Sequence, residues 1–214
     1  MSRFTIARAI CAVGARLAER GLIAGAEGNI GVRLGTNRLL VTPRGRSKGT
    51  LVPDELVEVD LDGRPLRGGE ASTELLMHLA IFRARPDVQA VVHAHPPTAT
   101  GFATAGLGLD CDCVPEMMAN LGSIPLVPYG MSGTAELGGQ MAPYIAAHDA
   151  LLLANHGAVT MGVTLEQAHL RMESVEQAAK ILLTARLLGG PVRLGAEDVE
   201  RLRAAREASA GRTR

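Results

Sequence analysis

The sequence predicts an α/β fold in one domain, and three observations support that prediction. The chain has 214 residues, and 47% of them are apolar, which is enough to build one complete core. Apolar runs of strand length lie at 88–93 and 150–154. Longer segments at 3–20 and 165–188 carry apolar residues at helical spacing. Helices that pack against short buried strands are typical of a layered α/β domain.

The first half of the chain is expected to form a helix, three strands and a second helix. In order these are a helix at 3–20, strands at 30–34, 38–42 and 55–60, and a helix at 73–85. Gly21 suits the C-cap of the first helix. Turn residues at 35–37 separate the first two strands, which we expect to form a β-hairpin. Ser72 or Thr73 suits the N-cap of the second helix, which Pro86 stops.

The second half is expected to alternate strands with helices. In order these are a strand at 88–93, a helix or turn at 98–105, a strand at 124–128, a helix at 136–146, a strand at 150–154 and a helix at 165–188. Gly189 and Gly190 terminate the last helix. Residues 195–214 carry many charges and few large apolar groups, so we expect a short polar C-terminal helix followed by a frayed basic tail.

Composition argues against nucleic acids and membranes as partners. Acidic and basic residues number 22 each, and the arginines are spread along the chain, apart from the C-terminal tail. Aromatic residues make up 2%, without Trp, so stacking platforms for single-stranded nucleic acid are scarce. No apolar run approaches the roughly 20 residues of a membrane span. The expected partner is therefore a small molecule.

Cysteine usage indicates a reducing compartment. Cys11, Cys111 and Cys113 are an odd number, and their spacing is not that of a zinc motif. Cys111 and Cys113 are also too close in sequence for an ordinary structural disulfide. We therefore expect three reduced thiols in a cytoplasmic protein.

The main functional pattern is a strand that ends in two histidines. Side chains alternate along a strand with period two, so His93 and His95 lie on one face and can share a metal ion. His156 follows the apolar run at 150–154 in the same manner. Each histidine alone also fits a structural or surface role, but the repeated pattern favours a metal site.

Two further stretches can supply a carboxylate and an anion-binding loop. Glu74 lies in the first turn of the expected helix, where the helix dipole favours a carboxylate whatever its function. His78 lies one turn further on the same face, either as a hydrogen-bond partner or as an ordinary helix contact. The loop at 42–49 combines glycines, hydroxyls and cations, which suits an anion but also suits a solvated turn.

These side chains together suit a limited class of reactions. Three neutral imidazoles with an open position form a catalytic metal arrangement, with zinc first and iron, cobalt or manganese as alternatives. Such a metal is a Lewis acid for a carbonyl or hydroxyl, and a nearby carboxylate can move a proton. With an anion pocket they suit enediolate chemistry on a phosphorylated ketose. The same set equally suits a dehydratase or a decarboxylase.

Several short motifs, taken in order, resemble the class II aldolase/adducin family, which is typified by L-fuculose-1-phosphate aldolase and L-ribulose-5-phosphate 4-epimerase. The resemblance covers residues 5–185. Its motifs are Gly28-Asn29, Thr42-Pro43-x-Gly45, Ser72-Thr73-Glu74 with His78, His93-x-His95 and Asn155-His156-Gly157. It implies a three-layer α/β/α sandwich around a mainly antiparallel central sheet over residues 1–194, with the polar helix and tail at 195–214 outside it. It also implies a homotetramer with active sites at subunit interfaces.

The resemblance assigns roles to the matching residues. It implies one Zn²⁺ per chain, or another divalent metal, held by His93, His95 and His156. It implies that Glu74 is the catalytic acid and base. The epimerases have an aspartate at that position, so the glutamate in this chain makes an epimerase less favoured. The residues that match the substrate and phosphate loops are Gly28, Asn29, Thr42, Gly45, Ser72 and Thr73.

Two loop residues depart from the family pattern. Gly31 and Arg44 each stand where the family usually has a serine, so two hydroxyls are missing and one cation is added. Arg44 can bind a phosphate or a carboxylate with two parallel hydrogen bonds, and we add it to the substrate-binding residues. It can equally turn outward. The expected substrate is a phosphorylated or carboxylated sugar-like molecule.

Three functions remain open at this point. The first is a metal-dependent aldolase, a lyase that cleaves a sugar phosphate or related aldol through a metal-stabilised enediolate. The second is a metal-dependent decarboxylase of a 3-oxo acid phosphate, or a dehydratase of the methylthioribulose-phosphate type. The third is a non-catalytic interaction domain like the adducin head, and the three retained histidines argue against it.

Overall fold

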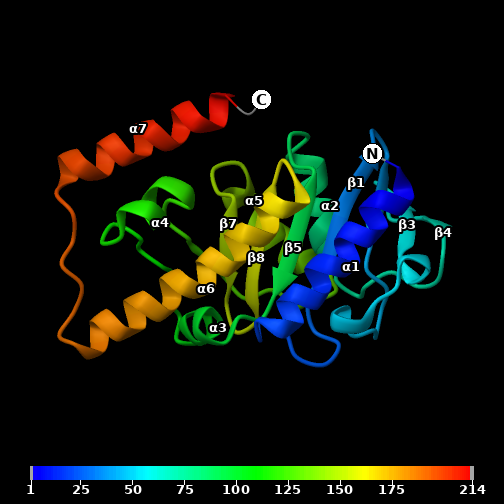
Figure 1. The fold of residues 1–214 in the computed structure, drawn as a ribbon, viewed down its shortest axis with the longest axis horizontal. Helices are drawn as coiled ribbons and strands as arrows, with labels where there is room; N and C mark the ends of the chain where they lie inside the picture. Colours follow the sequence, from blue (N-terminus) through cyan, green and yellow to red (C-terminus); the bar gives the residue numbers. More distant parts are fainter. Residues whose placement is uncertain (1, 213–214) are drawn as a thin grey trace.

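An eight-stranded sheet runs through the computed structural model, which describes residues 2–212 (Figure 1). Its strands are β1 (Asn29–Gly35), β2 (Arg38–Val41), β3 (Val57–Asp60), β4 (Pro65–Arg67), β5 (Ala90–Ala94), β6 (Leu126–Val127), β7 (Ala150–Leu153) and β8 (Gly157–Gly162). Their order across the sheet is β4-β3-β2-β1-β5-β8-β7-β6. Neighbouring strands are antiparallel except β6 and β7, which are parallel. The predicted mainly antiparallel sheet is confirmed.

Helices cover both faces of this sheet, which confirms the α/β/α sandwich (Figure 1). They are α1 (Arg3–Glu19), α2 (Leu75–Ala84), α3 (Pro97–Thr104), α4 (Pro115–Asn120), α5 (Ala135–Ile145), α6 (Leu165–Leu187) and α7 (Ala196–Arg212), with short 3-10 turns at Lys48–Thr50 and Pro53–Glu55. Helices α1, α3 and α6 share one core cluster with the sheet, and α2 and α5 share the other. Helix α7 packs against α4.

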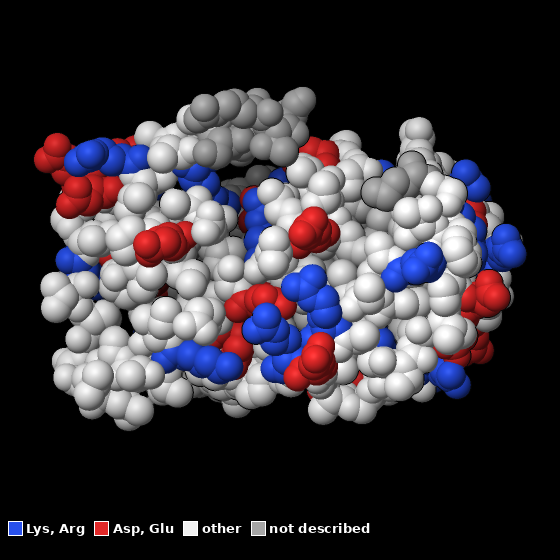
Figure 2. Space-filling view, viewed as in Figure 1, with Lys and Arg blue, Asp and Glu red and all other residues white. Residues whose placement is uncertain are grey.

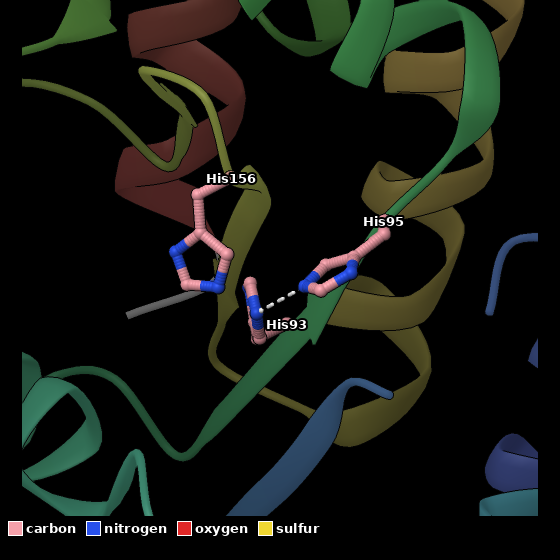
Figure 3. Close-up of side chains that lie close together, drawn as sticks. All are labelled: His93, His95 and His156. Carbon is pink, nitrogen blue, oxygen red and sulfur yellow. Dashed lines mark hydrogen bonds between the residues drawn. The ribbon is translucent and has the colours of Figure 1, made fainter. Parts of the chain in front are cut away.

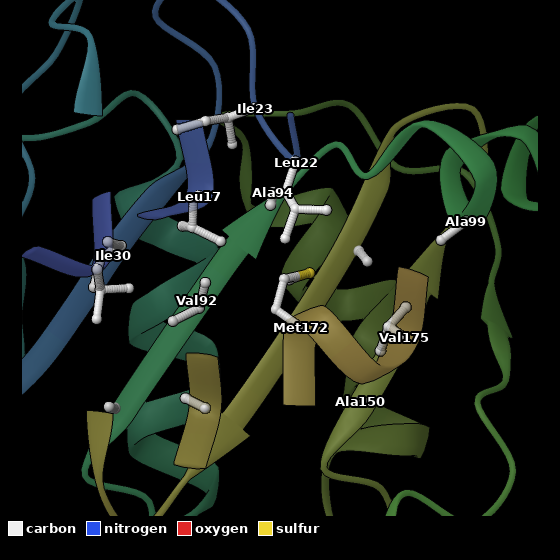
Figure 4. Packing of buried hydrophobic residues seen from close by; sticks show 14 of the residues in the cluster. Leu17, Leu22, Ile23, Ile30, Val92, Ala94, Ala99, Ala150, Met172 and Val175 are labelled. Carbon is white, nitrogen blue, oxygen red and sulfur yellow. The ribbon is translucent and has the colours of Figure 1, made fainter. Parts of the chain in front are cut away.

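Alternation along β5 explains why the core has two parts. Val92 packs with Leu17 of α1 and Met172 of α6 in the cluster drawn in Figure 4. Its neighbour Val91 faces the opposite side and packs in the cluster that contains Phe82 of α2. Full burial of one such side chain stabilises the fold by roughly 1.5–3 kcal/mol. Strand β5 is therefore held firmly from both faces, up to the end where the two histidines lie.

The register of the sheet brings distant residues to one edge. On β1, Asn29 lies opposite His93, and on the other side of β5 the partner of His93 is Val159 of β8. The short turn at 154–156 connects β7 to β8. The start of β1, the end of β5 and this turn therefore meet at the same edge of the sheet.

Most predicted elements agree with the structure within two or three residues. The helices at 3–20, 136–146 and 165–188 correspond to α1, α5 and α6. One helix start was wrong: α2 begins at Leu75, and its N-cap is Glu74 rather than Ser72 or Thr73. Glu74 makes no capping hydrogen bond with its side chain, because that side chain turns toward the histidines.

Three elements were not predicted from the sequence, namely β4, α4 and β8. The C-terminal helix is also longer than the short helix expected, because α7 spans Ala196–Arg212. The end of the expected basic tail, at 213–214, lies outside the described residues. The proposed division of the chain at residue 194 stays a prediction.

The helices, the charged surface and the cysteines each bear on the expectations from composition. Among the helices that the structure describes, none is long and apolar enough to span a membrane. On the face shown in Figure 2, acidic and basic side chains are interspersed. Cys11, Cys111 and Cys113 are free thiols, as predicted.

Candidate active site

The three predicted histidines come together at the edge of the sheet, and Figure 3 shows their rings pointing toward one another. His93 and His95 lie at the end of β5, and His156 lies in the turn before β8. Asn155 has φ 57°, a left-handed conformation that Asn tolerates better than most residues. At Gly157, a Cβ atom would lie 2.6 Å from the carbonyl oxygen of Ala94. Only glycine lets the turn approach β5 so closely.

The ligand atoms of the three rings fit a single metal ion. One nitrogen from each ring lies within 4.8 Å of the others. His93 is fully buried, and its Nδ1 is 2.9 Å from the carbonyl oxygen of Ala158, so Nδ1 carries the proton and donates. The Nε2 of His93 is the atom that faces the cluster, 3.1 Å from Nε2 of His95 (dashed line in Figure 3). A divalent cation between imidazoles of this kind is a common arrangement for a catalytic metal.

Glu74 lies directly beside the rings. Its Oε1 is 3.0 Å from Nε2 of His156, and its Oε2 is 3.2 Å from Nε2 of His93. Burial would raise the pKa of Glu74, but the positive field of His93 and hydrogen bonds from His156, His93 and Ser132 outweigh it. The pKa of Glu74 is therefore held well below its usual range, and the side chain is a carboxylate.

Asn29 links Glu74 to His78, so of the two alternatives for His78 the structure favours a hydrogen-bonding role, made through Asn29 and not directly to Glu74. The amide nitrogen of Asn29 donates to Oε2 of Glu74 at 2.7 Å. Nε2 of His78 donates to the amide oxygen of Asn29. Burial lowers the pKa of His78 to about 3, so its ring is neutral. The side chain of Glu74 is thus fixed through a buried neutral network.

A cavity of about 290 Å³ opens beside Glu74. Predicted site residues in its wall are Gly28, Asn29, Arg44, Gly45, Ser72, Thr73, Glu74, His95 and His156. His93 lies behind this wall, fully buried. Thr42 is placed differently from the expectation, because it is also fully buried and its hydroxyl accepts from the backbone N–H of Ile30. The Thr42 side chain therefore supports the loop at 42–49 from its buried side.

Three polar residues of the cavity wall were missed by the sequence reasoning, namely Glu27, Lys48 and Ser132. Lys48 is 3% exposed, its Nζ donates to the carbonyl oxygens of Ala26 and Arg46, and burial lowers its pKa. It belongs to the cation-rich loop at 42–49, which was the only signal for it. Ser132 donates to Oε1 of Glu74 from a loop without any motif.

Arg44 and Lys48 bring positive charge to the cavity wall that also contains Glu27 and Glu74. The side chain of Arg44 is 62% exposed, and its guanidinium forms an ion pair with Glu70 at 3.4 Å. An exposed pair of this kind is weak, so Arg44 is free to exchange Glu70 for another anion. The cavity therefore combines a cation site made of imidazoles, a carboxylate and a cationic loop.

Comparison with known proteins agrees with this arrangement. A family model described as Class II Aldolase and Adducin N-terminal domain matches residues 8–183. The chain is 38% identical over 192 residues to 3-oxo-tetronate 4-phosphate decarboxylase from Escherichia coli (strain K12), covering 86% of this chain and 89% of that protein. It is 32% identical over 168 residues to L-fuculose phosphate aldolase from Methanocaldococcus jannaschii, covering 78% and 90%.

A solved structure shows the same likeness in three dimensions. An L-fuculose 1-phosphate aldolase superposes with a TM-score of 0.88 at 29% sequence identity, and the match covers 98% of this chain and all of that one. The names of these similar proteins describe a decarboxylase and aldolases, which all break a carbon–carbon bond. With its fold, its histidines and its family match considered together, this chain belongs to the class II aldolase and adducin family.

Proposed function

We propose that this protein is a metal-dependent carbon–carbon lyase that decarboxylates a 3-oxo acid phosphate. The observation that carries the proposal is the cluster of His93, His95 and His156, with Glu74 in contact with two of these rings beside the 290 Å³ cavity. From the sequence alone, aldol cleavage came first and decarboxylation second. The 38% identity to a 3-oxo-tetronate 4-phosphate decarboxylase reverses that order.

The proposed cofactor is one Zn²⁺ per chain, held by His93, His95 and His156. Neutral imidazoles suit zinc, and the alternatives are iron, cobalt and manganese. When bound, the cation supplies Lewis acidity that stabilises negative charge on substrate oxygens. The buried face of the site keeps His93 in one tautomer through Ala158, so the donor set is ready before the substrate enters.

The remaining steps belong to side chains of this protein. Arg44 and Lys48 bind the phosphate, with the backbone N–H groups of the glycine-rich loops around them. The carboxylate of Glu74 accepts the proton of the substrate hydroxyl beside the ketone. The bond to the carboxyl carbon breaks, CO₂ leaves, and the electron pair stays on the neighbouring carbon and the ketone oxygen as an enediolate. Glu74 returns its proton to that carbon, and solvent reprotonates the hydroxyl oxygen.

Aldol cleavage is the second candidate, and the superposition on an L-fuculose 1-phosphate aldolase favours it. The same electron pair would remain on the substrate, but an aldehyde would leave in place of CO₂. Loss of water, as in a methylthioribulose-phosphate-type dehydratase, uses the same donors. An adducin-like interaction domain needs none of them, so the intact histidine cluster argues against it.

We also propose that the protein is a cytoplasmic homotetramer with its active sites at subunit interfaces. Exposed apolar side chains at the end of α6 and just after it support self-association, because Leu187, Leu188 and Val192 are 79%, 82% and 90% exposed. The free thiols suit a reducing compartment. Light scattering on the purified protein measures the assembly, and a monomer at micromolar concentration would contradict it.

A product assay tests the proposed reaction. The zinc-loaded protein is incubated separately with a 3-oxo acid phosphate and with ketose phosphates, and CO₂ and aldehyde are measured. We expect CO₂ from the 3-oxo acid phosphate, and we expect Glu74→Gln to lower kcat by about 10²–10⁴-fold while the metal stays bound. Aldehyde without CO₂ would make the protein an aldolase instead. Full activity in Glu74→Gln would remove Glu74 from the mechanism.

A further inference from the structure

The loop before β1 brings a second carboxylate, Glu27, to the three histidines. Glu27 lies in the cavity wall, and its Oε2 is 3.4 Å from Nδ1 of His95. The side chain of Glu27 is 47% exposed. A carboxylate in a cavity that binds anions repels the substrate, so its presence calls for a compensating role.

The orientation of the rings shows which nitrogen of His95 meets Glu27. The Nε2 atoms of His93 and His95 face each other at 3.1 Å, so Nε2 is the inward atom of both rings. The outward atom, Nδ1, is 2.9 Å from the Ala158 carbonyl in His93 and 3.4 Å from Glu27 in His95. A neutral imidazole that binds a metal through Nε2 carries its proton on Nδ1. Glu27 is therefore the acceptor available for the Nδ1 proton of His95.

The backbone holds Glu27 in this place from several sides. The N–H of His95 donates to the carbonyl oxygen of Leu22, and the N–H of Glu27 donates to the carbonyl oxygen of Ala24. Lys48 donates to the carbonyl oxygen of Ala26, the residue directly before Glu27. Directly after Glu27, a Cβ atom at Gly28 would lie 2.7 Å from the His93 carbonyl oxygen, so the loop packs on β5 without any gap.

We infer that Glu27 is a positioning residue that holds the Nδ1–H of His95 and so raises the affinity of the three-histidine site for a divalent cation. The inference rests on the metal centre of the proposed function. A carboxylate behind a ligating imidazole fixes the ring and its tautomer, and makes the metal-facing nitrogen a stronger donor. His93 has a neutral carbonyl in the same place, so Glu27 makes His95 the more strongly donating ring of the two.

Metal affinity of the stripped protein tests this inference without a substrate. The dissociation constants for Zn²⁺ and Co²⁺ are measured by competition with a chromophoric chelator for wild type, Glu27→Ala and Glu27→Gln. We expect Glu27→Ala to weaken binding by about 10-fold or more. Glu27→Gln should lose less, because its amide oxygen can still accept from Nδ1–H. The visible spectrum of bound Co²⁺ should change in Glu27→Ala, since the ring of His95 is no longer held.

Glu70→Gln is the matched control. It removes the same charge near the same cavity, but Glu70 pairs with Arg44 rather than with a histidine. Its metal affinity should stay within about twofold of wild type, as expected for an exposed pair. Unfolding of the metal-free variants in urea verifies that all of them fold.

Two results overturn the inference: a Glu27→Ala affinity within twofold of wild type, or an equal loss in Glu70→Gln, which indicates a general charge effect. If wild type binds tightly and Glu27→Ala binds equally tightly, the metal centre stands and only the role of Glu27 fails. If wild type itself binds no divalent cation, the proposed function and this inference fail together.

Discussion

At Gly31 the chain departs from the serine that the family resemblance implies, and two buried side chains supply the reason. A Cβ atom at Gly31 would lie 2.8 Å from Nδ1 of His78 and 3.3 Å from Cε2 of Phe82. The ring of His78 thus occupies the room that a serine would need, and from there it binds Asn29, which binds Glu74. The absence of a serine at position 31 therefore leaves room for the His78 ring, which holds the Glu74 carboxylate through Asn29.

Restoring the serine should therefore destabilise the protein. We expect Gly31→Ser to lower the free energy of unfolding by about 1–3 kcal/mol, the usual cost of overpacking a filled core. The measurement is urea unfolding at neutral pH. Gly35→Ser is the control in the same strand, because a Cβ atom at Gly35 would meet nothing within 4 Å. Equal stability of the two variants would show that the side chains of His78 and Phe82 can shift to make room for the serine without a measurable loss of stability.

Single residues also mark the limit of what the sequence could predict about the site. His93, His95 and His156 were predictable because strand periodicity and a repeated pattern put them together. Glu27 and Ser132 were not, since Glu27 lies beside the Gly28-Asn29 motif without being part of it and Ser132 lies in a loop without a motif. Only the fold shows that both reach the cavity. Their roles depend on contacts that join residues far apart in the chain.

At the scale of elements, prediction succeeded where one face of a segment is buried. The apolar spacing of α1, α5 and α6 located these helices because each packs one side against the sheet. Strand β4 was missed because all three of its residues are exposed. Strand β8 is buried at all six of its residues, so it shows no alternation of polar and apolar side chains that would mark it in the sequence. Helix α4 has six residues, too few for a period to show.

Asp149, just before β7, connects three helices to the sheet. Its carboxylate accepts from Arg85 at the end of α2 and from Arg206 of α7, and it forms an ion pair with Arg171 of α6 at 2.9 Å. The side chains of Arg85, Arg171 and Asp149 are 15%, 17% and 19% exposed. Removing the Asp149 carboxylate would take that anion away from Arg171 and Arg206 and leave Arg85 with Asp87, in a region with little solvent.

Asp149→Asn should therefore lower the free energy of unfolding by roughly 3 kcal/mol, in the range for breaking a mostly buried pair from one side. Chemical denaturation followed by circular dichroism measures it. Asp198→Asn in α7 is the matched control, because Asp198 is 59% exposed and pairs with the exposed Arg201. That change should cost less than about 1 kcal/mol. A similar small effect in both variants would mean that the Asp149 cluster does not join the elements.

At the scale of the whole molecule, the candidate metal centre exists only in the folded chain. Its donors come from the end of β5 and from the turn before β8, and Glu74 comes from the start of α2. The cavity beside them adds loops before β1 and after β2. A metal ion that binds this assembled site and not the unfolded chain will also stabilise the fold. Metal binding is thus the property on which the proposed chemistry depends.

The most direct test of that central claim is the metal content of the purified protein. Elemental analysis after zinc loading and dialysis is made on wild type, His95→Ala and the control His148→Ala, whose ring lies outside the histidine cluster. We predict about one zinc ion per chain in wild type and in His148→Ala, and loss of zinc in His95→Ala with the fold retained. Folded wild type that takes up no divalent metal, or equal zinc in His95→Ala, would contradict the account.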